Sequence, residues 1–208
     1  MGSPIRKRQR QVRGKFLLGL ALGFVVVIPG HAEQVCKPQH IRAATPTADF
    51  IDNPDGTVTH KRTGLVWMRC SLGQTWDGKS CTGEAKKLVW KEALQAAAAF
   101  NAAGGHAGHK DWRLPNIKEL DSIVETQCME PSINSSIFPN TPSARYWSST
   151  LSTTSDKDYA WYIRFNSGYL DDGRVVELYD PNNVPGKYAY HARLVRGGND
   201  FDALAGRR

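Results

Sequence analysis

The sequence lacks the motifs that mark the common enzyme classes. It contains no Gly-x-Ser-x-Gly elbow, no Walker loop, no His-Glu-x-x-His pair and no Rossmann glycine pattern. It also has no internal repeat, coiled coil or low-complexity tract. Because no nucleophile, base or phosphate-binding loop can be recognised, the sequence favours a binding or structural protein over an enzyme.

No apolar run reaches the roughly 20 residues that a membrane-spanning helix needs. One run of thirteen residues, Phe16 to Ile28, follows a basic stretch without acidic residues and is broken by Pro29. This arrangement is typical of a secretory signal peptide, and Gly30-His31-Ala32 fits its cleavage site. We expect residues 1–32 to be removed and the chain to act in the periplasm, at the cell surface or outside the cell. An uncleaved N-terminal anchor is the alternative.

A basic surface excess is also missing once that leader is set aside. The whole chain has 27 basic and 20 acidic residues, a formal net charge of +7. Six of the basic residues lie in the first fifteen positions, so the rest of the chain carries 21 basic against 20 acidic residues. Nucleic-acid binding normally needs a basic patch or stripe. The sequence therefore gives no support for a nucleic-acid partner.

The sequence has few cysteines, and they lack the Cys-x-x-Cys pairs typical of zinc knuckles. The four are Cys36, Cys70, Cys81 and Cys128. In an oxidising compartment, an even number predicts two disulfides, with three possible connectivities. The short polar segment between Cys70 and Cys81 favours a bridge between these two, which leaves Cys36 to pair with Cys128. A zinc site is the competing interpretation.

The hydrophobic pattern predicts an α+β domain with an antiparallel sheet. Residues 33–49 are expected to form an extended lead-in, and residues 199–208 a flexible tail. One amphipathic helix begins at Trp90 and ends before Gly104, and a second is capped by Asn116 and buries residues up to Val124. Strands are expected at Thr57–His60, Leu65–Met68, Tyr146–Thr150, Tyr159–Phe165, Tyr169–Leu170 and Tyr190–Val195.

Four stretches between residues 50 and 198 carry a family resemblance. They are Asp55-Gly56-Thr57-Val58-Thr59 with Arg62-Thr63-Gly64-Leu65-Val66-Trp67, Asp111 to Leu120, Tyr146-Trp147-Ser148-Ser149-Thr150, and Arg193-Leu194-Val195-Arg196-Gly197-Gly198. In this order they resemble the Lcl C-terminal domain family, the domain that ends a bacterial collagen-like surface adhesin. The collagen-like repeats of that adhesin are absent here.

The resemblance implies a C-type-lectin-like fold, with two helices, a mixed and mainly antiparallel sheet, and a long variable loop region. The Arg-Leu-Pro turn and the Arg-Gly-Gly near the end also resemble the sulfatase-modifying enzymes that share this fold. Such an oxidase needs a reactive cysteine pair, and two structural disulfides would leave no thiol. Fold kinship alone does not transfer function.

Metal-dependent sugar binding has little support in the sequence. The Glu-Pro-Asn loop and Trp-Asn-Asp strand of calcium lectins are missing, and only Glu130-Pro131-Ser132 is remotely similar. His106 and His109 have metal-ligand spacing, but no neighbouring carboxylate or cysteine completes a site. We therefore expect no cofactor and no metal. The tryptophans Trp67, Trp112, Trp147 and Trp161 are expected to lie in the core.

The segment from Tyr169 to Tyr190 is the candidate ligand surface, because it mixes aromatic rings with polar groups. Rigid rings supply contact area at low entropic cost, and carboxylates accept hydrogen bonds from hydroxyl-rich ligands. A turn at Asp172-Gly173 and tyrosines packed on the sheet are the alternative. The candidate residues are Tyr169, Asp171, Asp172, Arg174, Tyr179, Tyr188 and Tyr190, with Glu177 and Asp180 between them.

The leading hypothesis from the sequence is an exported, non-catalytic recognition module that binds a glycan or an envelope protein. A structural component of a cell-envelope assembly is the second hypothesis, and an enzyme of the sulfatase-modifying type is the third. The sequence gives neither the ligand nor the oligomeric state.

Overall fold

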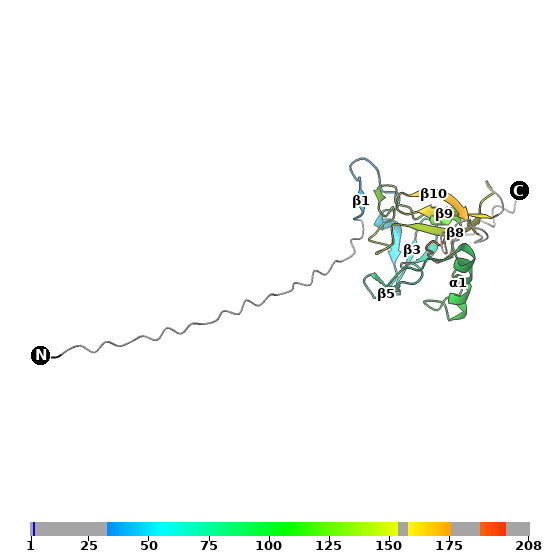
Figure 1. The fold of residues 1–208 in the computed structure, drawn as a ribbon, viewed down its shortest axis with the longest axis horizontal. Helices are drawn as coiled ribbons and strands as arrows, with labels where there is room; N and C mark the ends of the chain where they lie inside the picture. The colour runs from blue at the N-terminus through cyan, green and yellow to red at the C-terminus, as the bar shows by residue number, and fades with distance from the viewer. Residues whose placement is uncertain (1, 3–32, 154–157, 176–187, 199–208) are drawn as a thin grey trace. The chain divides into compact units, whose positions relative to one another are not determined.

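The computed structural model describes residues 2, 33–153, 158–175 and 188–198 (Figure 1). The predicted leader 1–32, apart from residue 2, and the predicted tail 199–208 lie outside these ranges, as do Glu177, Tyr179 and Asp180. The described elements lie in the compact unit that runs from Ala32 to Arg208. Within the described residues, no helix is long and apolar enough to cross a membrane.

A four-stranded antiparallel sheet contains two of the predicted strands. Its order is β11-β4-β3-β2, with β2 at Phe50–Asp52, β3 at Thr57–His60, β4 at Leu65–Met68 and β11 at Val195–Gly197. The predicted turn before β3 forms because the Asp55 carboxylate accepts hydrogen bonds from the backbone N–H and the hydroxyl of Thr57, at 2.9 and 2.6 Å. Gly56 supplies the positive φ of 84° that this turn requires.

A second sheet of three antiparallel strands holds the candidate site. Its order is β10-β9-β8, with β8 at Arg145–Leu151, β9 at Tyr159–Arg164 and β10 at Tyr169–Arg174 (Figure 1). Buried residues from both larger sheets and from α2 form the main core, which includes Trp67, Leu120 and Ile163. The α+β class with antiparallel sheets is therefore confirmed.

Two helices and two short strand pairs complete the domain. Helix α1 spans Trp90–Ala102 and α2 spans Ile117–Asp121, and a 3-10 turn, η1, covers Thr47–Asp49. Strand β1 (Val35–Cys36) pairs with β7 (Cys128–Met129), and β5 (Thr75–Trp76) pairs with β6 (Cys81–Thr82). We call residues 33–49 the N-terminal strap.

Hydrogen bonds, in addition to the disulfide of Cys36, hold the N-terminal strap on the domain. The carboxylate of Glu125, only 4% exposed, accepts hydrogen bonds from the backbone N–H groups of Ala44 and Thr45, both at 2.9 Å. The amide of Asn134 donates to the carbonyl of Thr45 at 2.9 Å. These polar contacts fix a segment that buries little apolar surface of its own.

Both disulfides form as the loop argument favoured. Cys36 is bonded to Cys128 and Cys70 to Cys81. All four cysteines are therefore in bridges, and no thiolate is left to bind zinc. Within the described residues, no group of three or more histidine, cysteine or acidic side chains is arranged to hold a metal ion.

Three local predictions differ from the structure. Helix α2 ends at Asp121, so the buried side chains of Ile123 and Val124 follow the helix instead of belonging to it. Strand β10 continues to Arg174, four residues beyond the predicted end, because it pairs with β9 along its whole length. Trp161 is half-buried, whereas the other three tryptophans expected in the core are at most 2% exposed.

The predicted strand from Tyr190 to Val195 is mostly wrong. The segment bridges Leu88 and Tyr146 through isolated pairs at Tyr190 and His191, and the strand itself begins only at Val195. Its backbone bonds several elements in turn, since the carbonyl of Ala192 accepts from Leu72 and that of Leu194 from Met68. A chain that changes partner at each step makes no continuous ladder.

Candidate functional site

Three aromatic side chains pack together on one face of the three-stranded sheet. The rings of Trp147 and Tyr190 are stacked with centroids 4.3 Å apart, and the ring of Tyr162 meets Tyr190 edge to face at 4.8 Å. Gly173 lies beneath them, where a Cβ atom would come within 3.1 to 3.3 Å of all three side chains. The glycine therefore allows the rings to lie close to the strand.

The aromatic group is mostly buried, but its edge is polar. Tyr190 is 7% exposed, and burial, followed by the nearby Tyr162, raises the pKa of its hydroxyl to about 12. The hydroxyl thus remains protonated at physiological pH and can donate a hydrogen bond. Beneath it, the indole N–H of Trp147 donates to the carbonyl of Leu88 at 2.9 Å, which fixes the orientation of the platform.

The guanidinium of Arg145 lies beside this platform. Its Cζ atom is 5.3 Å from the ring centroid of Tyr190 and 5.8 Å from that of Tyr162. Such contacts contribute about 0.5–1 kcal/mol at exposed sites. The side chain is exposed, and within the described residues it makes no ion pair. Arg145 is thus positioned by two rings while its N–H donors face solvent.

A second arginine on the same face is already paired. Arg164 forms an ion pair with the carboxylate of Asp171, which also accepts a hydrogen bond from the Tyr162 hydroxyl at 3.0 Å. Burial acts to raise the pKa of Asp171, but the hydroxyl of Tyr162, the backbone N–H of Asp172 and Arg164 together hold it below its ordinary value. Asp171 is therefore ionised at neutral pH and holds Arg164 in place.

These side chains border an open pocket of about 380 Å³. Three of its lining residues are basic, and Ser143 and Asn166 add neutral polar groups. The lining residues are Lys87, Ser143, Ala144, Arg145, Arg164, Asn166, Ala189, Tyr190 and His191. The pKa of His191 is lowered, chiefly by burial, so its ring is neutral at pH 7. We call this cavity the Arg145 pocket.

Strand alternation divides the residues predicted from sequence between two faces of the sheet. Tyr169 and Asp171 lie on the face of Arg164 and Tyr162, their partners across the strand pair. Asp172 and Arg174 lie on the opposite face, where Asp172 accepts from the Ser152 hydroxyl at 2.6 Å. The described candidates on β10 therefore lie on two faces of the sheet, and the ligand surface between Tyr169 and Tyr190 stays a prediction.

The aromatic residues of the prediction also differ in their surroundings. Tyr169 is 73% exposed, Tyr190 is buried in the platform, and Tyr188 is half-buried against it. Arg174 donates to the hydroxyl of Tyr159 at 3.1 Å on the far face. Of the described candidates, Tyr190 lines the Arg145 pocket, and Asp171 holds one of its arginines.

Sequence reasoning missed Lys87, Arg145, Tyr162 and Arg164. Arg145 and Arg164 are opposite each other in the strand register, and Trp147 is opposite Tyr162. Alternation along the two predicted strands was the available signal, because it places residues two apart on one face. The contribution of Lys87 had no such signal, since it lies in a loop 58 residues before Arg145 in the chain.

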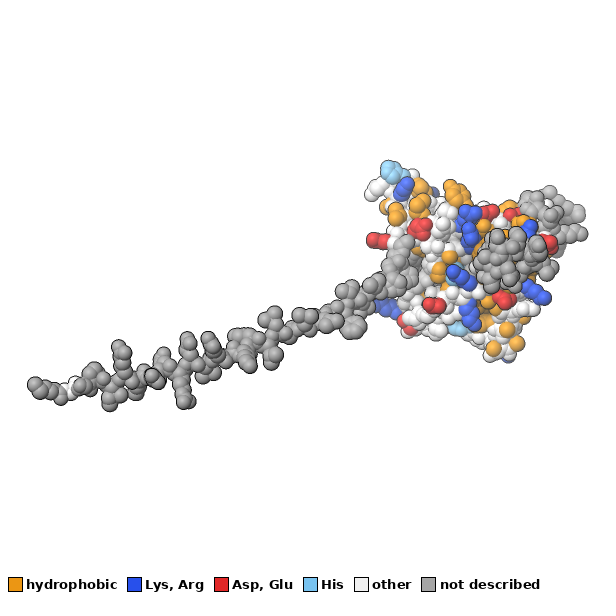
Figure 2. Space-filling model, viewed as in Figure 1, with side chains coloured by type: hydrophobic (Ala, Val, Ile, Leu, Met, Phe, Trp, Pro, Cys, Tyr) orange, Lys and Arg blue, Asp and Glu red, His pale blue; other side chains and the backbone are white. Residues whose placement is uncertain are grey.

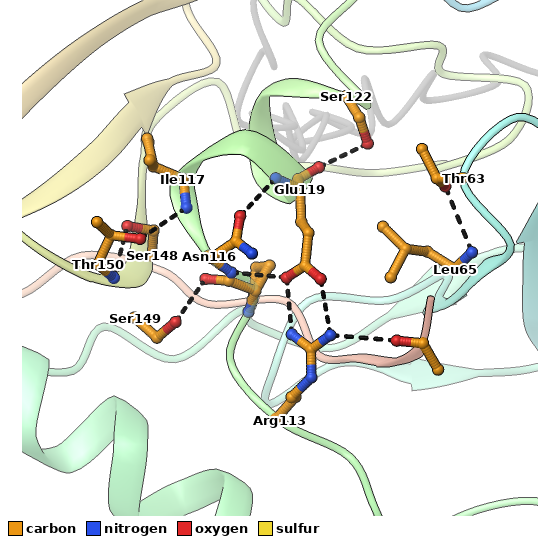
Figure 3. A network of polar contacts seen from close by, with 12 residues as sticks. Thr63, Leu65, Arg113, Asn116, Ile117, Glu119, Ser122, Ser148, Ser149 and Thr150 are labelled. Atoms are coloured by element: carbon orange, nitrogen blue, oxygen red, sulfur yellow. Dashed lines mark hydrogen bonds and ion pairs between the residues drawn. The ribbon is translucent and has the colours of Figure 1, made fainter. Parts of the chain in front are cut away.

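The residues of the Arg-Leu-Pro turn form a separate polar network (Figure 3). Arg113 donates to both carboxylate oxygens of Glu119, each at 2.7 Å, and to the carbonyl of Gly197 at 3.1 Å. The backbone N–H of Asn116 donates to Glu119, and its side chain accepts from the N–H of Glu119. This is the predicted capping box at the start of α2.

The same network joins the turn to the three-stranded sheet. The Thr150 hydroxyl accepts from the N–H of Ile117 at 3.0 Å, and the Ser149 hydroxyl donates to the carbonyl of Pro115 at 3.2 Å (Figure 3). The N–H of Ser149 donates to the same carbonyl at 2.8 Å. Stretches that carry the family resemblance thus meet at one place, and their polar groups are directed at one another. We call this set of contacts the Arg113 network.

Residues 56–196 match the model of the Lcl C-terminal domain. The chain belongs to the Lcl C-terminal domain family. The match begins at the turn before β3 and ends in β11, so it includes the three-stranded sheet, strands β3 and β4, most of β11 and the lining of the Arg145 pocket, whereas β2 precedes it. A search of curated proteins gave no match.

Proposed function

We propose that this Lcl C-terminal domain is an exported, non-catalytic recognition module that binds a glycan in the Arg145 pocket. The observation that carries the proposal is the exposed guanidinium of Arg145, which two tyrosine rings hold at the mouth of a polar cavity. Family membership supports a surface-associated role, and the two disulfides are compatible with an oxidising compartment.

The chemistry of the pocket favours a saccharide that carries anionic groups. The side chains of Lys87 and Arg145 are exposed and positively charged, and they can donate hydrogen bonds but cannot accept them. They therefore suit the oxygens of a carboxylate, sulfate or phosphate group. The polar side chains of Ser143 and Asn166 are suited to sugar hydroxyls. On the face shown in Figure 2, basic and acidic side chains are interspersed. This distribution favours a short ligand with a few anionic groups over a long polyanion bound along a basic stripe.

The C-type-lectin-like fold is part of this proposal. Two observations support this fold: the domain has helices beside antiparallel sheets, and the two ends of the matched region meet in one sheet, through β3 and β11. Calcium has no role in the binding proposed here, because the donors around the pocket are cationic and hydroxylic. The proposed interaction is accordingly insensitive to a chelator.

The test is binding of the exported protein to an array of neutral and uronate-containing or sulfated oligosaccharides. We expect acidic members to be retained and Arg145→Ala to weaken their binding about tenfold or more, the equivalent of one lost charge-assisted contact. Lys91→Ala, which removes an exposed lysine of α1 outside the pocket lining, is the matched control. Equal binding by both variants, or retention of no oligosaccharide, would contradict the proposal.

A further inference from the structure

The two disulfides differ sharply in their accessibility. Cys70 and Cys81 are 4% and 1% exposed, whereas Cys36 is exposed and Cys128 is half-buried. Thiol–disulfide exchange begins when a thiolate reaches one sulfur, so its rate depends on access. A reductant outside the domain therefore meets the Cys36–Cys128 bridge first.

This bridge closes the contact between the N-terminal strap and the domain. It lies within the two-residue pairing of β1 with β7, where Cys36 is opposite Cys128. On either side, the N–H of Lys37 donates to the carbonyl of Gln127 at 2.9 Å, and the Gln34 amide donates to the carbonyls of Pro131 and Ile133. So short a strand pair has little stability of its own without the covalent bond.

Strand β7 leads directly to the wall of the Arg145 pocket. Glu130 follows its last residue, and the N–H of Glu130 donates to the carbonyl of Asn166 at 3.1 Å. The carboxylate of Glu130 accepts a hydrogen bond from the Ser143 hydroxyl. Asn166 and Ser143 both line the pocket. A single residue, Met129, therefore separates Cys128 from Glu130, whose side chain positions the pocket wall.

The backbone at Glu130 needs support from its surroundings. Its φ is +56°, in the left-handed region that costs a non-glycine residue on the order of 1–2 kcal/mol. The hydrogen bonds to Asn166 and Ser143 on one side and the β1–β7 pairing on the other hold this conformation. Loss of the pairing would let Glu130 relax and withdraw its contacts from the pocket.

We propose that the Cys36–Cys128 bridge is a redox latch on the Arg145 pocket, opened by an exported dithiol reductant. A thiolate of the reductant attacks the Cys36 sulfur, the S–S bond breaks, and Cys128 leaves as a thiolate. The second thiol of the reductant then displaces Cys36, so the reductant becomes a disulfide and two electrons pass to the bridge. The buried Cys70–Cys81 bridge stays oxidised. The consequence for binding rests on the function proposed for the pocket.

The first test needs no ligand. The exported protein is titrated with dithiothreitol under native conditions, the free thiols are alkylated, and the modified cysteines are mapped by mass spectrometry. We expect Cys36 and Cys128 to be labelled at a reductant concentration about tenfold or more below that for Cys70 and Cys81, in line with their access. Simultaneous labelling, or earlier labelling of Cys70 and Cys81, would overturn the proposal.

The second test follows the pocket wall by amide hydrogen exchange. After partial reduction, exchange at Glu130 and at residues 143–145 and 164–166 is expected to become about tenfold faster, while α2 is unchanged. Unchanged exchange at Glu130 would overturn the latch. The double variant Cys36→Ser, Cys128→Ser should reproduce the faster exchange without reductant and should not respond further to it.

Binding to the uronate oligosaccharides of the array separates the two proposals. If the oxidised protein binds them and partial reduction weakens binding about fivefold or more, both stand. If the oxidised protein binds no oligosaccharide, the glycan function fails, and the labelling order and exchange still decide the latch. If reduced and oxidised protein bind equally, the latch is refuted and the glycan function remains.

Discussion

Arg113 and Arg145 illustrate how differently two regions of this domain use the same side chain. The guanidinium of Arg113 donates to both oxygens of Glu119 and to a backbone carbonyl. That of Arg145 rests on tyrosine rings and, within the described residues, makes no ion pair. In the Arg113 network the protein satisfies its own polar groups, whereas we propose that the donors of the Arg145 pocket bind another molecule.

The residues that identify the family in the sequence are not the residues that line the proposed binding site. Residues that carry the resemblance, such as Arg113, Asn116 and Thr150, hold the turn, the helix and the sheet together. The pocket depends on Lys87, Arg145 and Arg164, which lie outside the four stretches. A sequence match to these stretches therefore reports the framework more directly than the ligand.

A third arginine gives the largest expected effect. Arg193 is fully buried, and it donates to the carbonyls of Met68 and Arg69 and to the Thr141 hydroxyl. Burial lowers its pKa to about 10, so it is still charged at neutral pH. Arg193→Met would leave the carbonyls of Met68 and Arg69 and the buried Thr141 hydroxyl without these donors, and we expect a loss of about 3 kcal/mol or more in the free energy of unfolding.

Urea unfolding with both disulfides intact measures this loss. Arg145→Met is the control, and it should lower the free energy of unfolding by only about 1 kcal/mol, because it loses exposed cation–π contacts and no buried hydrogen bond. Similar losses for the two variants would remove the distinction between framework and pocket arginines.

An intermediate effect, dependent on pH, is expected at Glu125. Burial acts to raise its pKa, but the N–H groups of Ala44, Gln127 and Thr45 outweigh it and hold the pKa below the ordinary value of 4.5. A carboxylate with a lowered pKa contributes stability above its unfolded-state pKa, and this contribution is lost as the pH falls through the folded-state pKa. Stability of the wild type should therefore fall below about pH 4.5.

The variant Glu125→Gln tests that contribution. It replaces one acceptor oxygen by a donor, so we expect a loss of about 2 kcal/mol at pH 7. The same variant should show a smaller decline than the wild type between neutral and acidic pH. An equal decline in both proteins, measured by urea unfolding across this range, would show that Glu125 does not hold the N-terminal strap as described.

The smallest effect is expected at the helix cap. Asn116→Ala removes the side-chain acceptor for the N–H of Glu119 and should cost about 1 kcal/mol. It should leave oligosaccharide binding unchanged, because the cap belongs to the Arg113 network. Thermal unfolding and the glycan array together check the two statements, and weaker binding by this variant would link the regions that we have separated.

The sequence predicted correctly those features that depend on residues close together in the chain. The cap at Asn116, the turn at Asp55-Gly56 and the bridge over the short Cys70–Cys81 loop each depend on residues a few positions apart, and all three were found. The end of β10 was missed because Asp172-Gly173 has the composition of a turn, and pairing with β9 overrides it. Strand propensity is decided by such neighbours.

The roles of the arginines were not readable from the chain. Arg193 is more than 120 residues from its carbonyl acceptors at Met68 and Arg69, and Arg145 is 45 residues from Tyr190. Nothing local distinguishes a buried arginine from one that lines a pocket. The predicted ligand surface followed the order of residues in the sequence, and strand alternation divided it between two faces.

The central claim is that the Arg145 pocket, and not the Arg113 network, contacts the ligand. The most direct measurement is amide chemical-shift mapping of the labelled, oxidised protein during titration with an acidic oligosaccharide retained on the array. We expect saturable shifts at residue 87 and at residues 143–145, 164–166 and 189–191, with residues 113–119 unaffected. Shifts centred on residues 113–119, or on the far face of β10 at Asp172 and Arg174, would contradict it.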